Sequence, residues 1–154
     1  MRIAVLADTH VNRLEHLPKM IIDALSTVDL IIHAGDFTDA QLLEELKQLR
    51  EVKAVQGNMD SIELKTMLPV KEIVEIGNKR IGITHGSGGP WGIEERVRKV
   101  FESDRINVIV YGHSHQSRNK VINGILFFNP GKVTNSFGIL TIDEEAKGEI
   151  INSR

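Results

Sequence analysis

The sequence predicts an α/β protein in which two β-sheets pack against each other and carry helices on their outer faces. In the first half, three short apolar runs alternate with two segments of helical periodicity, a rhythm typical of parallel strands joined by right-handed crossovers. In the second half, the turn pairs Gly77-Asn78 and Asn123-Gly124 lie between strand-like runs and predict two β-hairpins. At 154 residues the chain has the length of one domain, so we expect residues 1–154 to form a single domain.

The first half supplies three expected strands and two expected helices. Ile3–Ala7, Leu30–His33 and Val52–Val55 are apolar runs short enough for strands buried on both faces of a sheet. A helix is expected over Leu17–Leu25, where Pro18 fits the first turn. An apolar stripe along one side predicts the second helix: Leu42, Leu43, Leu46 and Leu49.

The second half is richer in strands. Its expected strands are Val70–Ile76, Lys79–Thr84, Ile106–Tyr111, Val121-Ile122, Ile125–Phe128, Gly138–Ile142 and Glu149–Ile151. One amphipathic helix is marked by Ile93, Val97, Val100 and Phe101. Two packed sheets with the helices outside would bury every one of these runs.

Composition and charge exclude several classes of protein. Hydrophobic residues make up 41% of the chain and charged residues 26%, as in an ordinary globular protein. The net charge of −2 offers no general attraction for nucleic acid or an anionic membrane, so we expect neither as a partner. The absence of cysteine excludes disulfides, thiolate nucleophiles and Cys-ligated zinc. With no apolar run approaching a signal peptide or a membrane span, we expect a cytoplasmic protein, and a homo-oligomer remains possible.

Polar residues follow the buried runs at the points where the strands end. In open α/β sheets, ligands bind outside the carboxyl ends of the strands, so these side chains could converge on one crevice. The candidate metal ligands are Asp8, His10, Asp36, Asn58, His85, His113 and His115. Seven nitrogen or oxygen ligands are too many for one tetrahedral zinc, but they suit two metals that share a bridging carboxylate.

Each of these residues also has an ordinary structural interpretation. A single Asp or Asn after a strand is usually a turn former or a helix cap, and a single His is more often hydrogen-bonded than a ligand. Five strand ends with such residues in order favour the metal interpretation. In Tyr111-Gly112-His113-Ser114-His115, strand alternation would put both histidines on one side, whereas a bend at Gly112 would let their rings diverge toward two targets.

These residues fall into short motifs that can be compared with a known family. The motifs are Asp8-Thr9-His10 (DxH), Gly35-Asp36-Phe37-Thr38-Asp39 (GDxxD), Gly57-Asn58 (GN), His85-Gly86, Gly112-His113-Ser114-His115 (GHxH) and Asn129-Pro130-Gly131 (NPG). In this order they resemble the calcineurin-like metallophosphoesterase superfamily, and more closely its small bacterial and archaeal phosphodiesterase branch. The resemblance runs from Ile3 to about Gly131, which is nearly the whole chain.

The resemblance implies a fold, an activity and a ligand set. The fold would be a four-layer α/β/β/α sandwich of two mixed sheets flanked by helices. The activity would be hydrolysis of small phosphodiesters or phosphomonoesters by hydroxide held between two divalent transition metal ions, with Mn²⁺ expected first and Ni²⁺, Fe²⁺, Co²⁺ or Zn²⁺ also suited. Asp8, His10 and His115 would hold one metal, and Asn58, His85 and His113 the other, with Asp36 bridging. Asp8, His10, Asp36 and Asn58 would be the catalytic residues.

The sequence departs from the family pattern at one position that matters for catalysis. Larger members read GNHE, and their histidine can protonate the leaving group, whereas Met59 stands here and cannot transfer a proton. We therefore expect a preference for aryl or other good leaving groups. Asp39 loses the partner it would have had, so we expect it to cap the helix near Ala40. Lys132 stands where relatives often carry Ser after NPG.

Three further features have open roles. His33 is either a residue that orients a ligand or a satisfied core histidine. The segment Gly86–Gly92 fails the spacing of a dinucleotide-binding loop, so we expect it to shape the rim of the metal site. Trp91 is expected to pack over the start of the following helix, with stacking on an aromatic leaving group as the alternative.

Two other functions compete with the phosphodiesterase. A protein-binding scaffold on the same fold, like the retromer subunit, would tolerate loss of metal ligands, whereas all seven are present here. A DNA-repair nuclease is disfavoured by the absence of GNHE and of a capping domain and by the slightly acidic charge.

Overall fold

The computed structural model describes all residues, 1–154, as two five-stranded mixed sheets with helices outside them. The first sheet has the order β10-β9-β1-β2-β3 and the second the order β4-β5-β6-β8-β7. The strands are β1 (Arg2–Leu6), β2 (Leu30–His33), β3 (Glu51–Ala54), β4 (Lys71–Ile76), β5 (Lys79–Thr84), β6 (Val108–Val110), β7 (Arg118–Ile122), β8 (Ile125–Asn129), β9 (Ser136–Ile142) and β10 (Ala146–Asn152). The helices are the 3-10 turn η1 (Leu14–His16), α1 (Lys19–Leu25), α2 (Ala40–Leu49), α3 (Ile62–Met67) and α4 (Ile93–Val100).

Both sheets combine a parallel group of strands with antiparallel strands at one edge or both. β1, β2 and β3 are parallel, with Val5 opposite Ile32, and β9 joins the other edge of β1 antiparallel. In the second sheet β5, β6 and β8 are parallel, while β4 and β7 close the two edges as antiparallel hairpin partners. Both expected hairpins are present, and their turns are the predicted Gly77-Asn78 and Asn123-Gly124.

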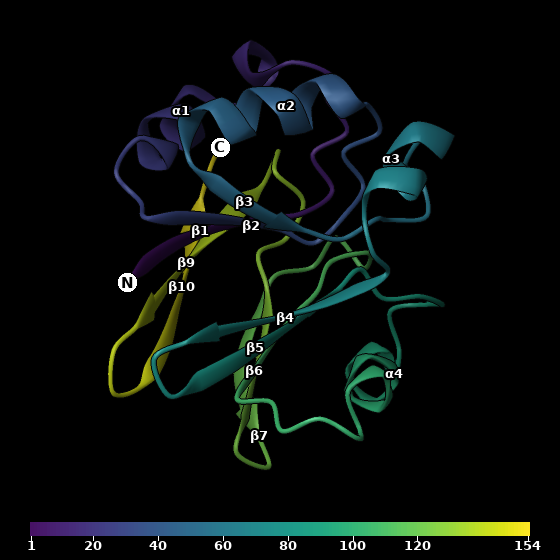
Figure 1. Cartoon of the computed structure of the whole chain (residues 1–154), viewed down its shortest axis with the longest axis vertical. Coiled ribbons are helices and arrows are strands. Elements are labelled where there is room, and N and C mark those ends of the chain that lie inside the picture. The colour runs from purple at the N-terminus through teal and green to yellow at the C-terminus, as the bar shows by residue number, and fades with distance from the viewer.

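Alternation along the central strands sorts the side chains into layers. In β1, Ile3 and Val5 face the second sheet, while Ala4 and Leu6 face the helices, because successive strand residues point to opposite faces. The cluster between the sheets takes apolar side chains from both of them, and a second cluster lies under α1 and α2. A third, smaller cluster lies between the second sheet and α4, where Val97 packs. The four-layer α/β/β/α sandwich is therefore confirmed (Figure 1).

The helix α3 was not predicted, and β7 is longer than the strand predicted at Val121-Ile122. The helix α3 buries only Leu64, while Ile62 is exposed, so its sequence has no apolar stripe to mark a helix. Ser61 caps it by accepting a hydrogen bond from the Leu64 backbone N–H. β7 begins at Arg118, three residues before the expected strand, because an edge strand needs little apolar character.

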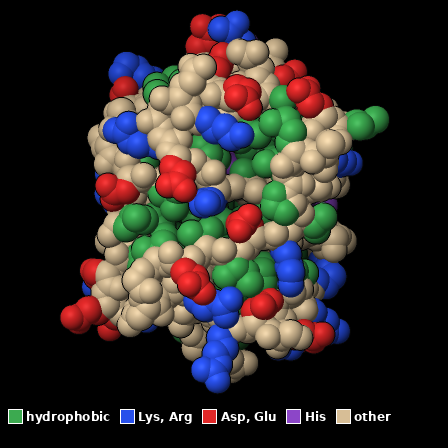
Figure 2. Space-filling model, viewed as in Figure 1, with side chains coloured by type: hydrophobic (Ala, Val, Ile, Leu, Met, Phe, Trp, Pro, Cys, Tyr) green, Lys and Arg blue, Asp and Glu red, His purple; other side chains and the backbone are tan.

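One edge of the sandwich is open between β3 and β4. A cavity of about 340 Å³ lies there. Figure 2 shows hydrophobic side chains across the middle of this face, interspersed with charged ones. The lining residues are Met1, Asp29, Leu30, Glu51, Lys53, Ile73, Val74, Glu75 and Ile76. None of the helices combines the length and the apolar character that a membrane crossing requires.

Candidate metal centre

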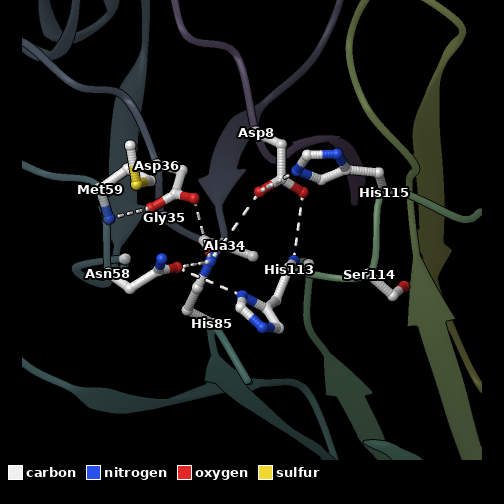
Figure 3. Close-up of polar contacts among 12 residues, drawn as sticks. Asp8, Ala34, Gly35, Asp36, Asn58, Met59, His85, His113, Ser114 and His115 are labelled. Atoms are coloured by element: carbon white, nitrogen blue, oxygen red, sulfur yellow. Dashed lines mark hydrogen bonds and ion pairs between the residues drawn. The ribbon is translucent and has the colours of Figure 1, made fainter. Parts of the chain in front are cut away.

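All seven predicted side chains stand on loops at one end of the sandwich. Asp8 and His10 follow β1, Asp36 follows β2, Asn58 follows β3, His85 follows β5, and His113 and His115 follow β6. Because β1 to β3 are parallel, and β5 and β6 are parallel in the other sheet, the carboxyl ends of these strands meet at a common edge. Figure 3 shows the side chains from the two sheets turned toward one another.

Backbone conformation in these loops is unusual. Five of the seven residues have positive φ angles: 52° at Asp8, 50° at His10, 63° at Asp36, 68° at His113 and 61° at His115. Non-glycine residues rarely adopt this left-handed conformation, and such strain persists where surrounding contacts enforce it. The strain is therefore concentrated on the loops that carry the predicted ligands.

The first group of donor atoms contains Asp8, His10 and His115. Their donor atoms all lie within 4.8 Å of one another, and the Asp8 Oδ1 to His115 Nε2 distance is 3.6 Å. Asp8 is completely buried, and its other oxygen, Oδ2, accepts a hydrogen bond from the His113 backbone N–H at 3.2 Å. Asp8 Oδ1 and His10 Nε2 are buried and have no hydrogen-bond partner. Buried polar atoms without a partner are rare in proteins, and a cation between them would satisfy both.

The second group is centred on His85. Its Nε2 lies 3.0 Å from Asn58 Oδ1 and 3.3 Å from Asp36 Oδ2. Asn58 Oδ1 also lies 3.2 Å from Nδ1 of His113, which brings the fourth residue into the group. Asp36 lies between the two groups, because its Oδ2 is also 3.9 Å from His10 Nε2.

The hydrogen bonds of the two histidines leave lone pairs pointing into this second group. His85 Nδ1 lies 2.7 Å from the Ala34 carbonyl, and His113 Nε2 lies 2.8 Å from the Gly88 carbonyl. A carbonyl oxygen only accepts, so these two ring nitrogens carry the protons and the opposite nitrogens carry the lone pairs when the rings are neutral. With both rings neutral the group therefore gathers acceptor atoms only, and protonation of His85 is what supplies a donor to Asp36 in the metal-free protein. Such a set fits a divalent cation of intermediate hardness, which takes both imidazole nitrogen and carboxylate or amide oxygen.

Ionisation of the buried groups reflects the same crowding. Burial raises the pKa of Asp8 to about 7. Burial alone would raise the pKa of Asp36, but the hydrogen bond and charge of His85 outweigh it, so the pKa is lowered. For His85, burial would lower the pKa, but Asp36 outweighs burial and raises it. The centre thus attracts positive charge, which bound metal ions would supply.

A buried carboxylate that the sequence analysis left without a role holds the loops in place. Asp60 accepts hydrogen bonds from the backbone N–H groups of Asp36 at 3.1 Å, Thr38 at 2.8 Å and Gly57 at 2.7 Å. A Cβ at Gly57 would collide with Asp36 Oδ1, so the two loops approach too closely for any side chain there. In the sequence, the only indication of this role is that Asp60 lies two residues after the GN motif.

The NPG element and Ser114 have positioning contacts. Asn129 is completely buried, and its Nδ2 donates to the Gly112 carbonyl and to Ser114 Oγ, both at 3.1 Å. Its Oδ1 accepts from the Gly131 backbone N–H at 2.9 Å. Asn129 therefore supports the loop that carries His113, and Ser114 takes part in that support.

The structure shows the contacts of three residues outside the ligand set: His33, Asp39 and Trp91. His33 is completely buried, accepts from the Gly35 N–H at 3.1 Å and lies 3.1 Å from Thr9 Oγ1, so it is a satisfied histidine that also joins two ligand-bearing loops. Asp39 caps α2 by accepting from the Gln41 N–H, as expected. Packing of Trp91 over the helix start is wrong, because its side chain is 90% exposed.

Comparison with known proteins identifies the family. The model of the calcineurin-like phosphoesterase superfamily domain matches residues 1–145. The chain belongs to the calcineurin-like phosphoesterase superfamily. A probable metallophosphoesterase of Methanocaldococcus jannaschii is 42% identical over 136 residues, 87% of this chain and 69% of that protein. A phosphodiesterase of the same organism is 27% identical, and the match covers 98% of this chain and 99% of that protein.

A solved structure extends the comparison to three dimensions. Wild-type Vps29 of Entamoeba histolytica, in complex with Zn²⁺, superposes with a TM-score of 0.78 at 26% identity, covering 100% of each chain. Membership of the calcineurin-like phosphoesterase superfamily indicates hydrolysis of phosphate esters with divalent metal ions. The paired donor groups of this chain fit such ions.

Proposed function

We propose that the protein is a phosphodiesterase that hydrolyses small phosphate esters with hydroxide from water activated between two divalent metal ions. Asp8, His10 and His115 would hold one ion, and Asn58, His85 and His113 the other, with Asp36 shared. The observation that carries this proposal is the convergence of lone pairs in the second group, where His85 Nε2, Asn58 Oδ1 and Asp36 Oδ2 face one another.

The side chains divide the work of holding this centre. Each of the two carboxylates has one oxygen anchored by a backbone N–H and one directed inward: Asp36 Oδ1 accepts from Met59 at 2.8 Å, and Asp8 Oδ2 accepts from His113. Two ions held by the inward oxygens would lower the pKa of a shared water and offset the charge on the phosphoryl oxygens. Asn58 and His115 are exposed, so the substrate would approach from their side.

Room for the ester group of a substrate lies next to this centre. A cavity of about 310 Å³ adjoins Asn58 and His85. Its lining combines the cationic side chains of Lys65 and Arg96 with the apolar side chains of Val70, Val97 and Val100, and it includes no acidic residue. This charge suits an anionic ester, because an acidic wall would repel it.

Met59 sets the expected choice of leaving group. Its side chain is 59% exposed at the position where larger relatives carry the proton donor, and a thioether transfers no proton. We propose that aryl and other good leaving groups are therefore preferred. Rates measured for a series of aryl phosphodiesters should fall steeply as the pKa of the leaving phenol rises; a flat dependence would contradict the preference.

The central experiment is hydrolysis of bis-p-nitrophenyl phosphate by metal-stripped protein, with Mn²⁺, Ni²⁺, Fe²⁺, Co²⁺ and Zn²⁺ added back singly. We expect activity to return with at least one ion, and Mn²⁺ is the first to try. The Asp36→Ala variant should lose both activity and paired-metal occupancy, while Asp23→Ala on the surface of α1 should keep both. An Asp36→Ala protein that still binds two ions would refute the bridging role.

A second candidate function is a protein-binding scaffold. One observation favours it: large apolar side chains are exposed, including Trp91 at 90%, Ile62 at 86% and Val70 at 65%, and Val70 lines the cavity that adjoins Asn58 and His85. The similarity to Vps29 is in keeping with this candidate. A metal-loaded protein that hydrolyses none of the esters in the series would favour the scaffold over the enzyme.

A further inference from the structure

The glycine-rich segment Gly86–Gly92 is held by a single side chain. Arg96, on α4, donates from Nε to the Ser87 carbonyl at 2.7 Å and from Nη1 to the Trp91 carbonyl at 2.8 Å, and Nη2 donates to the Gly89 carbonyl. A planar guanidinium can reach three carbonyls in one plane, which a lysine ammonium cannot reproduce.

Apart from the hydrogen bonds to Arg96, no buried apolar side chain of its own fixes the segment Gly86–Gly92. Ser87 to Gly92 are all exposed, and Trp91 is 90% exposed, so the segment buries no side chain of its own. Without Arg96 its backbone would have little to fix it, since exposed segments with few buried contacts open at low free energy. The conformation of the segment therefore depends on the guanidinium.

The same segment makes a contact with a predicted metal ligand. The Gly88 carbonyl accepts a hydrogen bond from His113 Nε2 at 2.8 Å. With the proton held on Nε2, the lone pair of His113 is on Nδ1, which lies 3.2 Å from Asn58 Oδ1. Metal-binding histidines are commonly oriented in this way, by donating their other N–H to a carbonyl.

Gly88 itself fits only without a side chain. Its φ angle is +75°, and an added Cβ would lie 3.0 Å from Arg96 Cζ. A side chain at this position would therefore strain the backbone and displace the guanidinium. The glycine, the arginine and the histidine thus form one connected arrangement.

We propose that Arg96 is a positioning residue which, through the Gly88 carbonyl, sets the tautomer and direction of His113. It would thereby raise the affinity for the metal ion that Asn58, His85 and His113 hold. This role is separate from the place of Arg96 in the lining of the cavity beside the centre, and it requires no contact with metal or substrate. The inference rests on the ligand assignment of the proposed function, but it makes a claim about metal binding rather than about turnover.

The first test is a calorimetric titration of metal-stripped protein with Mn²⁺. Arg96→Ala should weaken one of the two binding events about 10- to 100-fold and leave the other unchanged. Arg98→Ala is the matched control, since Arg98 lies on the same helix and its Nη2 pairs with Glu95 at 2.7 Å. The control should bind both ions as the wild type does.

Trp91 gives a readout that involves no metal. It is the only tryptophan in the chain and lies within the held segment, so its fluorescence anisotropy reports the mobility of that segment. In metal-free protein the anisotropy should fall in Arg96→Ala and stay at the wild-type value in Arg98→Ala. An unchanged anisotropy in Arg96→Ala would overturn the claim that Arg96 holds the segment.

A double-mutant cycle separates positioning from a general structural effect. If Arg96 acts through His113, then Arg96→Ala should cost less than twofold in Mn²⁺ affinity when added to His113→Ala. Losses that multiply in the double variant would overturn the inference. Gly88→Ala should reproduce the selective loss, which keeps the proposal testable if urea unfolding shows that Arg96→Ala does not fold.

Failure of this inference and failure of the proposed function have different results. Suppose that the wild type binds two Mn²⁺ ions but hydrolyses no phosphodiester, and that Arg96→Ala has a lower Mn²⁺ affinity at one site. These results would support the inference and overturn the proposed enzyme activity. Wild-type affinity at both sites in Arg96→Ala would overturn the inference and leave the enzyme standing. A wild-type protein that binds no Mn²⁺ and none of the other four ions would overturn both.

Discussion

The Asp60→Ala variant should lose both stability and metal affinity, because one buried carboxylate joins two loops of the candidate centre. Asp60 is 5% exposed, and its two oxygens accept three backbone N–H groups, from Gly57, Asp36 and Thr38. Two of these bonds are buried, and the bond to Thr38 is partly buried. Removing the carboxylate leaves donors that water reaches poorly.

The size of the effect follows from those three bonds. A hydrogen bond to a charged acceptor contributes about 1.5–3 kcal/mol, and a buried donor left without a partner costs about 1–3 kcal/mol. Because the partly buried Thr38 N–H can regain water, we expect a total loss of about 3–5 kcal/mol in the free energy of unfolding. That is a large fraction of the free energy of unfolding of a typical domain, which is roughly 5–15 kcal/mol. Displacement of Asp36 should also weaken Mn²⁺ binding about 10- to 100-fold.

The assay is urea unfolding of metal-free protein, followed by Mn²⁺ titration under folding conditions. Asp39→Ala is the matched control, since Asp39 also accepts a backbone N–H, but it makes this single bond at an exposed helix start. The control should lose about 1 kcal/mol, the usual value of a helix cap, and keep its Mn²⁺ affinity. An Asp60→Ala protein that unfolds within about 1 kcal/mol of the wild type, or that binds Mn²⁺ with unchanged affinity, would refute this role of Asp60.

Three further predictions address ionisation, the leaving group and cooperativity. Burial raises the pKa of Asp8 to about 7, so between about pH 4 and 7 the folded metal-free protein keeps a proton that the unfolded chain releases, and the contribution of Asp8 to stability falls as the pH rises. Asp8→Asn should therefore gain stability relative to the wild type as the pH rises from about 4 to 7 in chelator, measured by urea unfolding; a difference that stays constant over this range would contradict this. Met59→His should speed hydrolysis of alkyl esters more than of p-nitrophenyl esters, whereas Met59→Gln should not, and equal gains on both substrates would argue against proton donation. If residues 1–154 form one domain, far-ultraviolet circular dichroism and the near-ultraviolet signal of buried Tyr111 should show a single coincident urea transition, and separate midpoints would contradict a single domain.

Much of the fold could be predicted because its signals are local. Runs such as Ile3–Ala7 and Leu30–His33 are apolar throughout, and that composition alone indicates strands buried on both faces. The hairpin turns are equally local, since Gly77-Asn78 and Asn123-Gly124 favour the required conformation wherever they occur. The helix α3 was missed because it has no such local signal: only Leu64 among its residues is buried, so there is no apolar stripe.

The candidate ligands could be predicted from their position after the strands, since parallel strands bring their carboxyl ends to one edge. The contacts that orient those ligands could not. The Asp8 carboxylate meets the His113 N–H across 105 positions of sequence, and nothing in either neighbourhood specifies that pairing. Positive φ angles at Asp8 and His113 are likewise imposed by the surrounding loops, because these residue types do not require them.

The residue types at the strand ends, and therefore the chemistry open to the centre, are written in the order of the chain. The contacts that support that centre form only in the folded molecule. Asp60 accepts from the Asp36 backbone N–H, Asn129 donates to the Gly112 carbonyl, and Arg96 donates to the Ser87 carbonyl. Each of these side chains acts through backbone groups of other loops. A backbone N–H or carbonyl is present at almost every residue, so the sequence carries no mark of which one a distant side chain will bind.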